Sequence, residues 1–265
     1  MFQYNSLFIS DIHLGTRNAQ VDSLLEFLRL VEAETIYLVG DIVDFWKFKR
    51  KILWPQSHND VVQKLLRKVR KGTRIVFIPG NHDESLRDYC GYSFGGIEIQ
   101  RDAVHLTSNG TRYKVLHGDE FDVIVRYARW LAFLGDRSYE FALFLNGPLN
   151  WCRRHLGFGF WSLSGFLKYR IKTAVRFISD YEKALVQVAK HNNVDGVICG
   201  HIHHPSDRRI DGIHYLNCGD WVESCTAIAE LPSGQMQVIY WKEIAAGLIS
   251  NSGSDKLLIG SQAAA

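Results

Sequence analysis

Five short motifs in the 265-residue sequence combine residue types that bind metal ions and phosphate. The motifs are Asp11-Ile12-His13, Gly40-Asp41 with Asp44, Gly80-Asn81-His82-Asp83, His117-Gly118 and Gly200-His201-Ile202-His203. A pair of cations held about 3.5–4 Å apart can clamp a phosphoryl group and activate water near neutral pH. Such a pair needs a carboxylate that can bridge the ions, together with neutral imidazoles and an amide oxygen. The motifs therefore predict two-metal hydrolysis of a phosphoester.

The spacing within the motifs supports this prediction. Alternate residues of an extended segment share a face, so D-x-H and H-x-H each direct two side chains to one side. Glycines beside several candidate ligands let the backbone approach the metals closely. Imidazole with oxygen ligands suits Mn, Fe or Zn rather than Ca. A single histidine or aspartate at a strand end is usually a turn or cap residue, but all five motifs in this order indicate a site.

Each motif begins at or just after the end of a predicted apolar strand. These strands are 7–9, 36–39, 75–78, 113–116 and 197–199. Apolar residues recur at helical spacing over 21–31, and 61–69 has the pattern of a basic amphipathic helix. Strands alternating with helices predict a largely parallel, helix-flanked α/β sheet, which gathers the motifs at its strand ends. Residues 212–216, 225–231 and 236–241 predict an antiparallel finish.

A segment rich in aromatic residues and arginine interrupts this succession of predicted strands and helices. We predict a core from residues 1–120 and 179–245, an inserted helical cap at 121–178 and a disordered tail at 246–265. Between Val123 and Ile178 there are nine lysines and arginines but only two acidic residues. Two interpretations stay open. The segment binds an anionic membrane surface or a phosphorylated lipid, or its aromatic residues form the core of the cap while its arginines are solvated.

Composition narrows the class of protein further. The net charge of +3 is too small to indicate nucleic-acid binding. In addition, the basic residues of the insert alternate with bulky apolar ones, unlike a groove that follows a phosphate backbone. The five cysteines form no CxxC pair, which is typical of thiols in a reducing compartment. Without a signal peptide or a run of about 18–20 apolar residues, we expect a cytoplasmic location.

The combination D-x-H, GD-x-x-D, GNH-[D/E], HG and GH-x-H resembles the calcineurin-like metallophosphoesterase superfamily over about residues 7–203. The resemblance implies a four-layer αββα sandwich, here with the inserted cap. It assigns Asp11, His13 and His203 to one ion, Asp41 as the bridge, and Asn81, His117 and His201 to the other ion. His82 is implied as the catalytic histidine that faces the substrate phosphate. Asp83 either orients its ring as a second catalytic residue or caps residues 84–89, and Asp44 is either a carboxylate behind the ligands or a helix cap.

Within this superfamily, Gly40–Trp46 and the basic insert are similar to the UDP-2,3-diacylglucosamine pyrophosphatase family. That family makes lipid X and UMP in lipid A biosynthesis, usually with manganese. The resemblance implies two divalent ions, Mn²⁺ or otherwise Fe or Zn, and peripheral association with the cytoplasmic face of the inner membrane. It also implies that cap residues bind substrate phosphates. The candidates are Arg126, Arg129, Arg153, Arg154, Lys168 and Lys172.

One departure from that family keeps other substrates open. His82 stands where the lipid A enzymes typically carry arginine, giving GNHD rather than GNRD. The alternative is a paralogous phosphodiesterase or phosphatase that acts on another lipid or nucleotide. A non-catalytic scaffold of the same fold is disfavoured, because every ligand position holds a residue able to bind metal. We expect a phosphorylated small molecule or lipid as the partner, and no nucleic acid.

Overall fold

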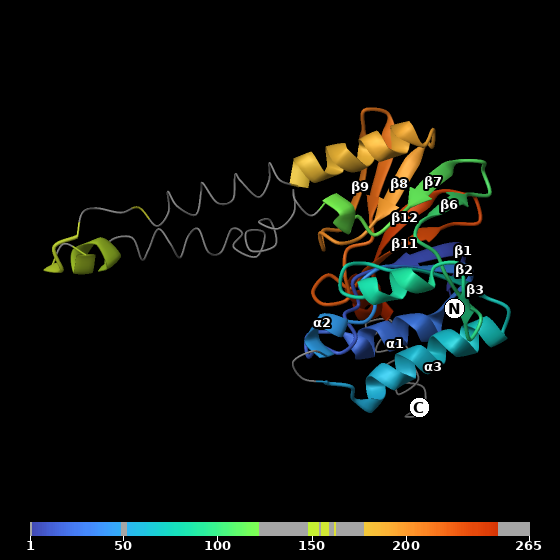
Figure 1. The fold of residues 1–265 in the computed structure, drawn as a ribbon, viewed down its shortest axis with the longest axis horizontal. Coiled ribbons are helices and arrows are strands. Elements are labelled where there is room, and N and C mark those ends of the chain that lie inside the picture. The colour runs from blue at the N-terminus through green and yellow to red at the C-terminus, as the bar shows by residue number, and fades with distance from the viewer. Residues whose placement is uncertain are drawn as a thin grey trace, which may run out of the picture. The chain divides into compact units, whose positions relative to one another are not determined.

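The computed structural model describes residues 2–48, 52–121, 148–153, 155–158, 162 and 178–248 (Figure 1). The chain divides into two compact units. One unit comprises Met1–Asp119 and Val188–Ala265, and the other comprises Glu120–Gln187. The second unit begins one residue before the predicted cap and extends beyond the predicted end of the cap at residue 178.

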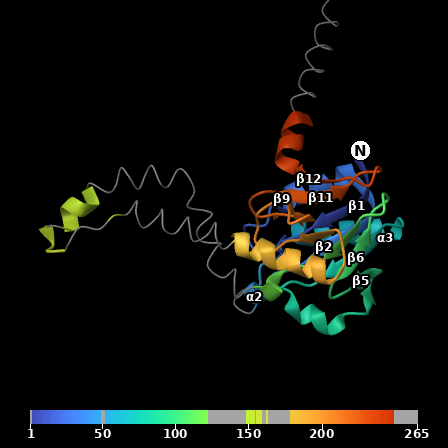
Figure 2. The same cartoon turned by 90° about the horizontal axis from the view of Figure 1, so that it is seen from above.

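The first unit contains a sheet of seven strands in the order β12-β11-β1-β2-β3-β5-β4. The strands are β1 (Phe2–Ile9), β2 (Val31–Val39), β3 (Arg74–Ile78), β4 (Ser93–Phe94), β5 (Ile97–Ile99), β11 (Thr226–Glu230) and β12 (Met236–Tyr240). β1, β2, β3 and β5 are parallel, in a register that pairs Leu7 with Ile36 and Ile36 with Ile75. Antiparallel pairs complete the sheet: β11 with β1, β12 with β11, and β4 with β5. Figure 2 shows β12, β11 and β1 next to one another.

A second sheet of five strands has the order β6-β7-β8-β10-β9. The strands are β6 (Ala103–Leu106), β7 (Arg112–Val115), β8 (Gly196–Cys199), β9 (Ser206–Ile210) and β10 (Ile213–Asn217). β7, β8 and β10 are parallel, and β6 and β9 pair antiparallel at the two edges. β9 was not predicted, because this edge strand exposes its three central residues and so lacks an apolar pattern.

The helices of the described residues are mostly short. They are α1 (Val21–Leu30), α2 (Phe45–Phe48), α3 (Gln56–Arg70), η1 (Glu84–Tyr89), η2 (Asp119–Phe121), and helices at 148–153, 178–191 and 241–248. α1 ends one residue earlier than predicted, because Val31 is already extended and opens β2. The helix at 241–248 continues three residues into the segment predicted as a disordered tail, so that boundary is corrected. None of the described helices is long and apolar enough to cross a membrane.

Two layers of apolar side chains hold the first unit together. Phe8 and Val76 of the first sheet pack with Ile198 and Leu216 of the second sheet, so the two sheets lie face to face. The opposite face of the first sheet packs against helix residues such as Leu24, and α1 and α3 lie below this sheet in Figure 1. Parallel strands buried on both faces are apolar at consecutive positions, which is why the central strands were predicted correctly. The predicted α/β fold of two sheets with helices is confirmed.

Candidate metal centre

The five motifs follow five strands whose carboxyl ends lie at one edge of the two sheets. Asp11, Asp41 and Asn81 follow β1, β2 and β3, whereas His117 and His201 follow β7 and β8. Backbone hydrogen bonds join these loops to one another. Asp11 N donates to Gly40 O at 3.0 Å, and Gly200 N donates to His117 O at 3.2 Å. The parallel topology thus brings together residues up to 192 positions apart, from Asp11 to His203.

The side chains form two clusters, and a third group overlaps both. Each contains three ligand atoms within 4.8 Å of one another. The two clusters are Asp11, His13 and His203, and Asp41, His117 and His201, and the overlapping group is His13, Asp41 and His82. His203 Nε2 lies 3.0 Å from Asp11 Oδ1, and His117 Nε2 lies 3.4 Å from Asp41 Oδ1. His13 Nε2 joins the two clusters, because it lies 3.8 Å from an oxygen of each aspartate.

The backbone at these ligands is left-handed, which corrects the extended D-x-H and H-x-H geometry assumed from the sequence. The φ angles lie between 51° and 70° for Asp11, His13, Asp41, His201 and His203. Non-glycine residues rarely adopt this region, and such strain concentrates at functional sites. The paired side chains therefore reach one centre through tight turns rather than through strand alternation.

Two glycines make room for neighbouring ligands. A Cβ on Gly200 would lie 2.5 Å from Asp11 Oδ2, and a Cβ on Gly80 would lie 2.6 Å from His117 Nε2. Both contacts are closer than real Cβ atoms show. These glycines therefore let the loop backbone approach the ligand side chains of adjacent loops, not only the metals as the sequence analysis expected.

Several buried polar atoms of the centre have no hydrogen-bond partner. Among the described residues, eight buried side-chain nitrogen or oxygen atoms are unpaired, and six of them belong to this centre. The six are Asp11 Oδ1, Asp41 Oδ2, Asn81 Oδ1, His82 Nδ1, His82 Nε2 and His117 Nε2. Unpaired buried polar groups are costly, and each one calls for an explanation. Carboxylate and amide oxygens beside imidazole nitrogens are a donor set that fits divalent metal ions.

The charges of the centre also favour a bound cation. Burial by itself would raise the pKa of Asp11, but the nearby imidazoles of His203, His117 and His13 outweigh it and hold this pKa well below its usual range. Burial would likewise lower the pKa of His117, yet Asp41 and Asp11 raise it to about 10. A site that holds a proton this strongly attracts positive charge. The same field would stabilise metal ions.

His82 lies between Asp44, in the loop after β2, and Trp46 of α2. Asp44 Oδ1 is 3.1 Å from His82 Nδ1, and Asp44 Oδ2 is 3.5 Å from His13 Nδ1. Asp44 also accepts a hydrogen bond from Lys47 N at 2.9 Å, so both roles left open for it are present. On the other side, the Trp46 ring lies 4.2 Å from the His82 ring at 34°. Trp46 was not predicted as a site residue, because its contact with His82 arises only from tertiary packing.

Asp83 has a different role from either one predicted. Its side chain makes no cap hydrogen bond to η1. Instead, the buried carboxylate accepts bonds from four backbone N–H groups, those of Gly80, Ile42, Asp41 and Val43, at 2.6–3.3 Å. Burial and the nearby Asp41 raise the pKa of Asp83 to about 6. Asp83 therefore joins the loops after β2 and β3, while Asp44 is the carboxylate that faces the His82 ring.

Further residues outside the predicted set hold the loops of the centre. Asn217 donates to Gly200 O at 2.8 Å and accepts from Gly219 N at 2.9 Å, which fixes the turn before His201. Arg87 binds both carboxylate oxygens of Asp119 at 2.7 and 2.8 Å, two residues after His117. No motif marks these residues in the sequence, because their partners lie far along the chain.

Most of the predicted substrate-binding residues lie outside the described residues. These are Arg126, Arg129, Arg154, Lys168 and Lys172. The exception is Arg153, whose guanidinium carbon lies 5.5 Å from the centre of the Phe158 ring.

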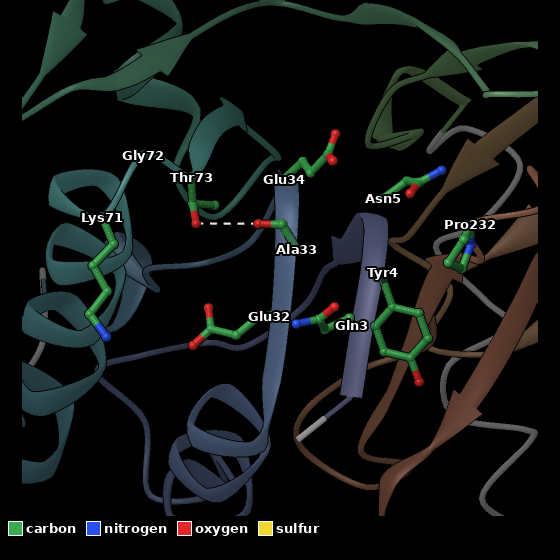
Figure 3. A pocket seen from close by; sticks show the side chains of 10 residues that line it. All are labelled: Gln3, Tyr4, Asn5, Glu32, Ala33, Glu34, Lys71, Gly72, Thr73 and Pro232. Carbon is green, nitrogen blue, oxygen red and sulfur yellow. Dashed lines mark hydrogen bonds between the residues drawn. The ribbon is translucent and has the colours of Figure 1, made fainter.

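A hollow of about 740 Å³ lies at the opposite end of the strands from the metal centre. It is lined by Gln3, Tyr4, Asn5, Glu32, Ala33, Glu34, Lys71, Gly72, Thr73 and Pro232. Figure 3 shows the side chains of Lys71, Glu32 and Glu34 spread around it, and Thr73 donates to Ala33 O at 3.2 Å. None of these residues belongs to a candidate metal cluster of the described chain. The volume of a hollow therefore does not identify the candidate catalytic site in this protein.

Comparisons with known proteins agree with the motifs. The model of the family described as "Calcineurin-like phosphoesterase" matches residues 4–205. The chain is 28% identical to UDP-2,3-diacylglucosamine hydrolase of Neisseria gonorrhoeae, covering 82% of this chain and 89% of that protein. It is 25% identical to the Vibrio cholerae protein of the same name, covering 91% and 96%. A solved archaeal phosphodiesterase aligns with a TM-score of 0.43 at 14% identity, covering 88% of this chain and 98% of that chain.

Proposed function

Since the chain belongs to the calcineurin-like phosphoesterase family of metal-dependent hydrolases, we propose that it hydrolyses a phosphoester or pyrophosphate bond with two divalent ions. The main support is the group of unpaired buried atoms on Asp11, Asp41, Asn81 and His117, which converge at the ends of four strands. Within the described residues these atoms meet only imidazoles and carboxylates of the same centre, as Asp11 Oδ1 meets His203 Nε2 at 3.0 Å, and they form no hydrogen bond of good geometry.

The proposed ligands follow the two clusters. Asp11, His13 and His203 would hold one ion, and His117 and His201 with the unpaired amide oxygen of Asn81 would hold the other, while Asp41 would be shared between them. When bound, the ions supply Lewis-acid activation of water and neutralise charge on the phosphoryl group. The mixture of imidazole and oxygen donors favours Mn²⁺, with Fe or Zn as alternatives. Ligand softness thus selects the class of metal.

His82 has the geometry of a proton donor in this proposal. Asp44 Oδ1 lies 3.1 Å from Nδ1 without forming a hydrogen bond, so this carboxylate attracts the protonated ring electrostatically. Nε2 is the atom that faces the centre, 3.9 Å from Asp41 Oδ2. In the protonated imidazole, Nε2–H donates to a phosphoryl oxygen or to the leaving group. Trp46 covers one face of the ring and limits its rotation.

For the substrate we propose a lipid-linked nucleotide such as UDP-2,3-diacylglucosamine, cleaved to lipid X and UMP. Two observations support it: the relatives carry that name at 25–28% identity, and the insert is basic and aromatic. The alternative is a paralogous phosphodiesterase or phosphatase acting on another lipid or nucleotide. His82, in place of arginine, favours that alternative. A cytoplasmic location, peripheral membrane association and the absence of nucleic acid stay predictions from the sequence.

Metal content and turnover test the reaction class together. We expect purified protein loaded with Mn²⁺ to contain two ions per chain and to release UMP from UDP-2,3-diacylglucosamine. His201→Ala should lose metal and activity, whereas His191→Ala, at an exposed position outside the centre, should keep both. Turnover of bis(p-nitrophenyl) phosphate without UMP release would favour the paralogue. Fewer than one ion per chain, with no turnover of either compound, would contradict the proposed function.

A further inference from the structure

A smaller hollow lies beside the candidate metal centre. Its volume is about 270 Å³. It is lined by Gly15, Thr16, Arg17, Asn18, Lys47 and Leu53. Pockets for whole drug-sized ligands measure roughly 300–1,000 Å³. This hollow is therefore suited to one group of a substrate rather than to the entire molecule.

Hydrogen bonds connect both walls of the hollow to residues of the candidate metal centre. Thr16 donates to His13 O from its backbone at 3.2 Å and from its hydroxyl at 2.9 Å. Lys47 N donates to Asp44 Oδ1 at 2.9 Å, and Asp44 faces both His13 and His82. The hollow is therefore connected directly to the loops that carry His13 and Asp44.

The hollow is cationic and contains no carboxylate. Arg17 and Lys47 are exposed, and in the part of the chain that the structure describes neither side chain forms an ion pair. The remaining lining residues are uncharged. Two cations without a counter-ion repel each other, and an anion placed between them makes charge-assisted hydrogen bonds with both. Phosphate suits this arrangement, because arginine binds it in a bidentate manner and lysine as a point charge.

We propose that this hollow binds a second phosphate group of the substrate, separate from the phosphoryl group that is hydrolysed. The proposal rests on the proposed function for its biological meaning, but the binding itself can be measured without turnover. It predicts that preferred substrates are phosphorylated at two places or contain a pyrophosphate, rather than being simple diesters.

A matched control comes from a similar hollow in the helical layer. That hollow, of about 260 Å³, lies between α1 and α3 and includes Arg29, Lys64 and Arg67 together with Asp60. Replacing Lys64 and Arg67 by glutamine removes the same charges as Arg17→Gln/Lys47→Gln. A diffuse electrostatic effect would be equal in the two double variants, whereas a local site would respond only to the second.

The first experiment is isothermal titration of metal-free protein with inorganic pyrophosphate. Removing both charge-assisted contacts in Arg17→Gln/Lys47→Gln should raise Kd about tenfold or more. Lys64→Gln/Arg67→Gln should change it less than twofold, and Arg17→Lys/Lys47→Arg, which keeps both charges, should largely restore binding. Equal losses in the two glutamine variants, or no loss in either, would overturn the proposal.

The second experiment uses thymidine 5′-(p-nitrophenyl phosphate) with and without a 3′-phosphate, in the Mn²⁺-loaded protein. We expect wild type to prefer the doubly phosphorylated compound in kcat/KM. This preference should fall about tenfold in Arg17→Gln/Lys47→Gln, mainly through KM, and persist in Lys64→Gln/Arg67→Gln. An unchanged preference in the first variant would contradict the site. If neither compound is hydrolysed by wild type, the proposed function fails, while the titration still decides whether the hollow binds phosphate.

Discussion

Two buried groups of histidine and carboxylate side chains differ in how their polar atoms are paired. At the metal centre, Asp41 and His117 keep buried atoms without hydrogen-bond partners. In the other group, His105 Nε2 lies 2.9 Å from Glu230 Oε2, and His105 Nδ1 lies 3.3 Å from the Tyr37 hydroxyl. This second group joins β6 of the second sheet to β2 and β11 of the first.

The difference separates a ligand site from a structural network built of the same residue types. Polar networks whose members are all paired stabilise a fold, whereas unpaired buried groups destabilise it unless another partner binds. The two groups also differ in backbone conformation. Asp41 has a φ of 55°, while no positive φ is found at His105 or Glu230. Burial of a histidine beside a carboxylate therefore does not by itself indicate catalysis.

The largest effect should follow from Asp41→Asn, with Glu230→Gln as the matched loss of a buried charge. Asp41 is the carboxylate next to both clusters, 3.4 Å from His117 and 3.8 Å from His13. We expect kcat to fall about 10³-fold or more, because both proposed ions lose a ligand. Inductively coupled plasma mass spectrometry should find at most one ion per chain. Retention of two ions and full activity would show that the centre is not the metal site; Glu230→Gln should keep both.

Metal binding should stabilise the fold by the next largest amount. Ions that bind only the folded chain at 100 times Kd add about 2.7 kcal/mol to the free energy of unfolding. Urea denaturation with and without Mn²⁺ measures this, and a chelator should reverse it. The increment should be the same in His105→Gln, since the paired network holds no metal. No increment in wild type would mean that the unpaired atoms of the centre do not bind Mn²⁺.

Family membership and the α/β fold could be predicted because they depend on residue type, order and apolar runs. Asp11, His13 and His201 each follow a strand that is apolar enough to identify. The contacts that could not be predicted depend on which loops lie next to one another in the folded chain. The carboxylate of Asp83 binds the backbone of Ile42, 41 positions away.

The left-handed turns and the Trp46–His82 contact could not be predicted from the sequence either. Aspartate and histidine tolerate this conformation more often than most residues, but nothing in D-x-H requires it. Trp46 is 42% exposed and its neighbours show no aromatic pattern that points to His82. Such contacts follow from tertiary packing rather than from local sequence.

A smaller effect is expected from breaking the paired network. His105→Gln removes a buried partner of Glu230 and of Tyr37. Buried groups that lose a partner cost about 1–3 kcal/mol, and Glu230 still accepts a bond from Ser108 N at 2.8 Å. Urea denaturation should show a loss of that size while kcat changes less than twofold. A large loss of activity in a normally folded variant would mean that the network supports the centre, and the contrast between the two groups would fail.

The smallest effect is a pH dependence of the same network. Burial lowers the pKa of His105, and the opposing attraction of Glu230 does not cancel it. Below pH 6.5 the unfolded chain therefore binds a proton that the folded chain excludes, so His105 makes the fold less stable as the pH falls. The free energy of unfolding of wild type relative to His105→Gln, both metal-free, should decrease between pH 7 and pH 5, by at most about 1.4 kcal/mol per pH unit. A difference that grows toward acid pH would show that the pairing with Glu230 outweighs burial, and would make the network a charged pair rather than a neutral one.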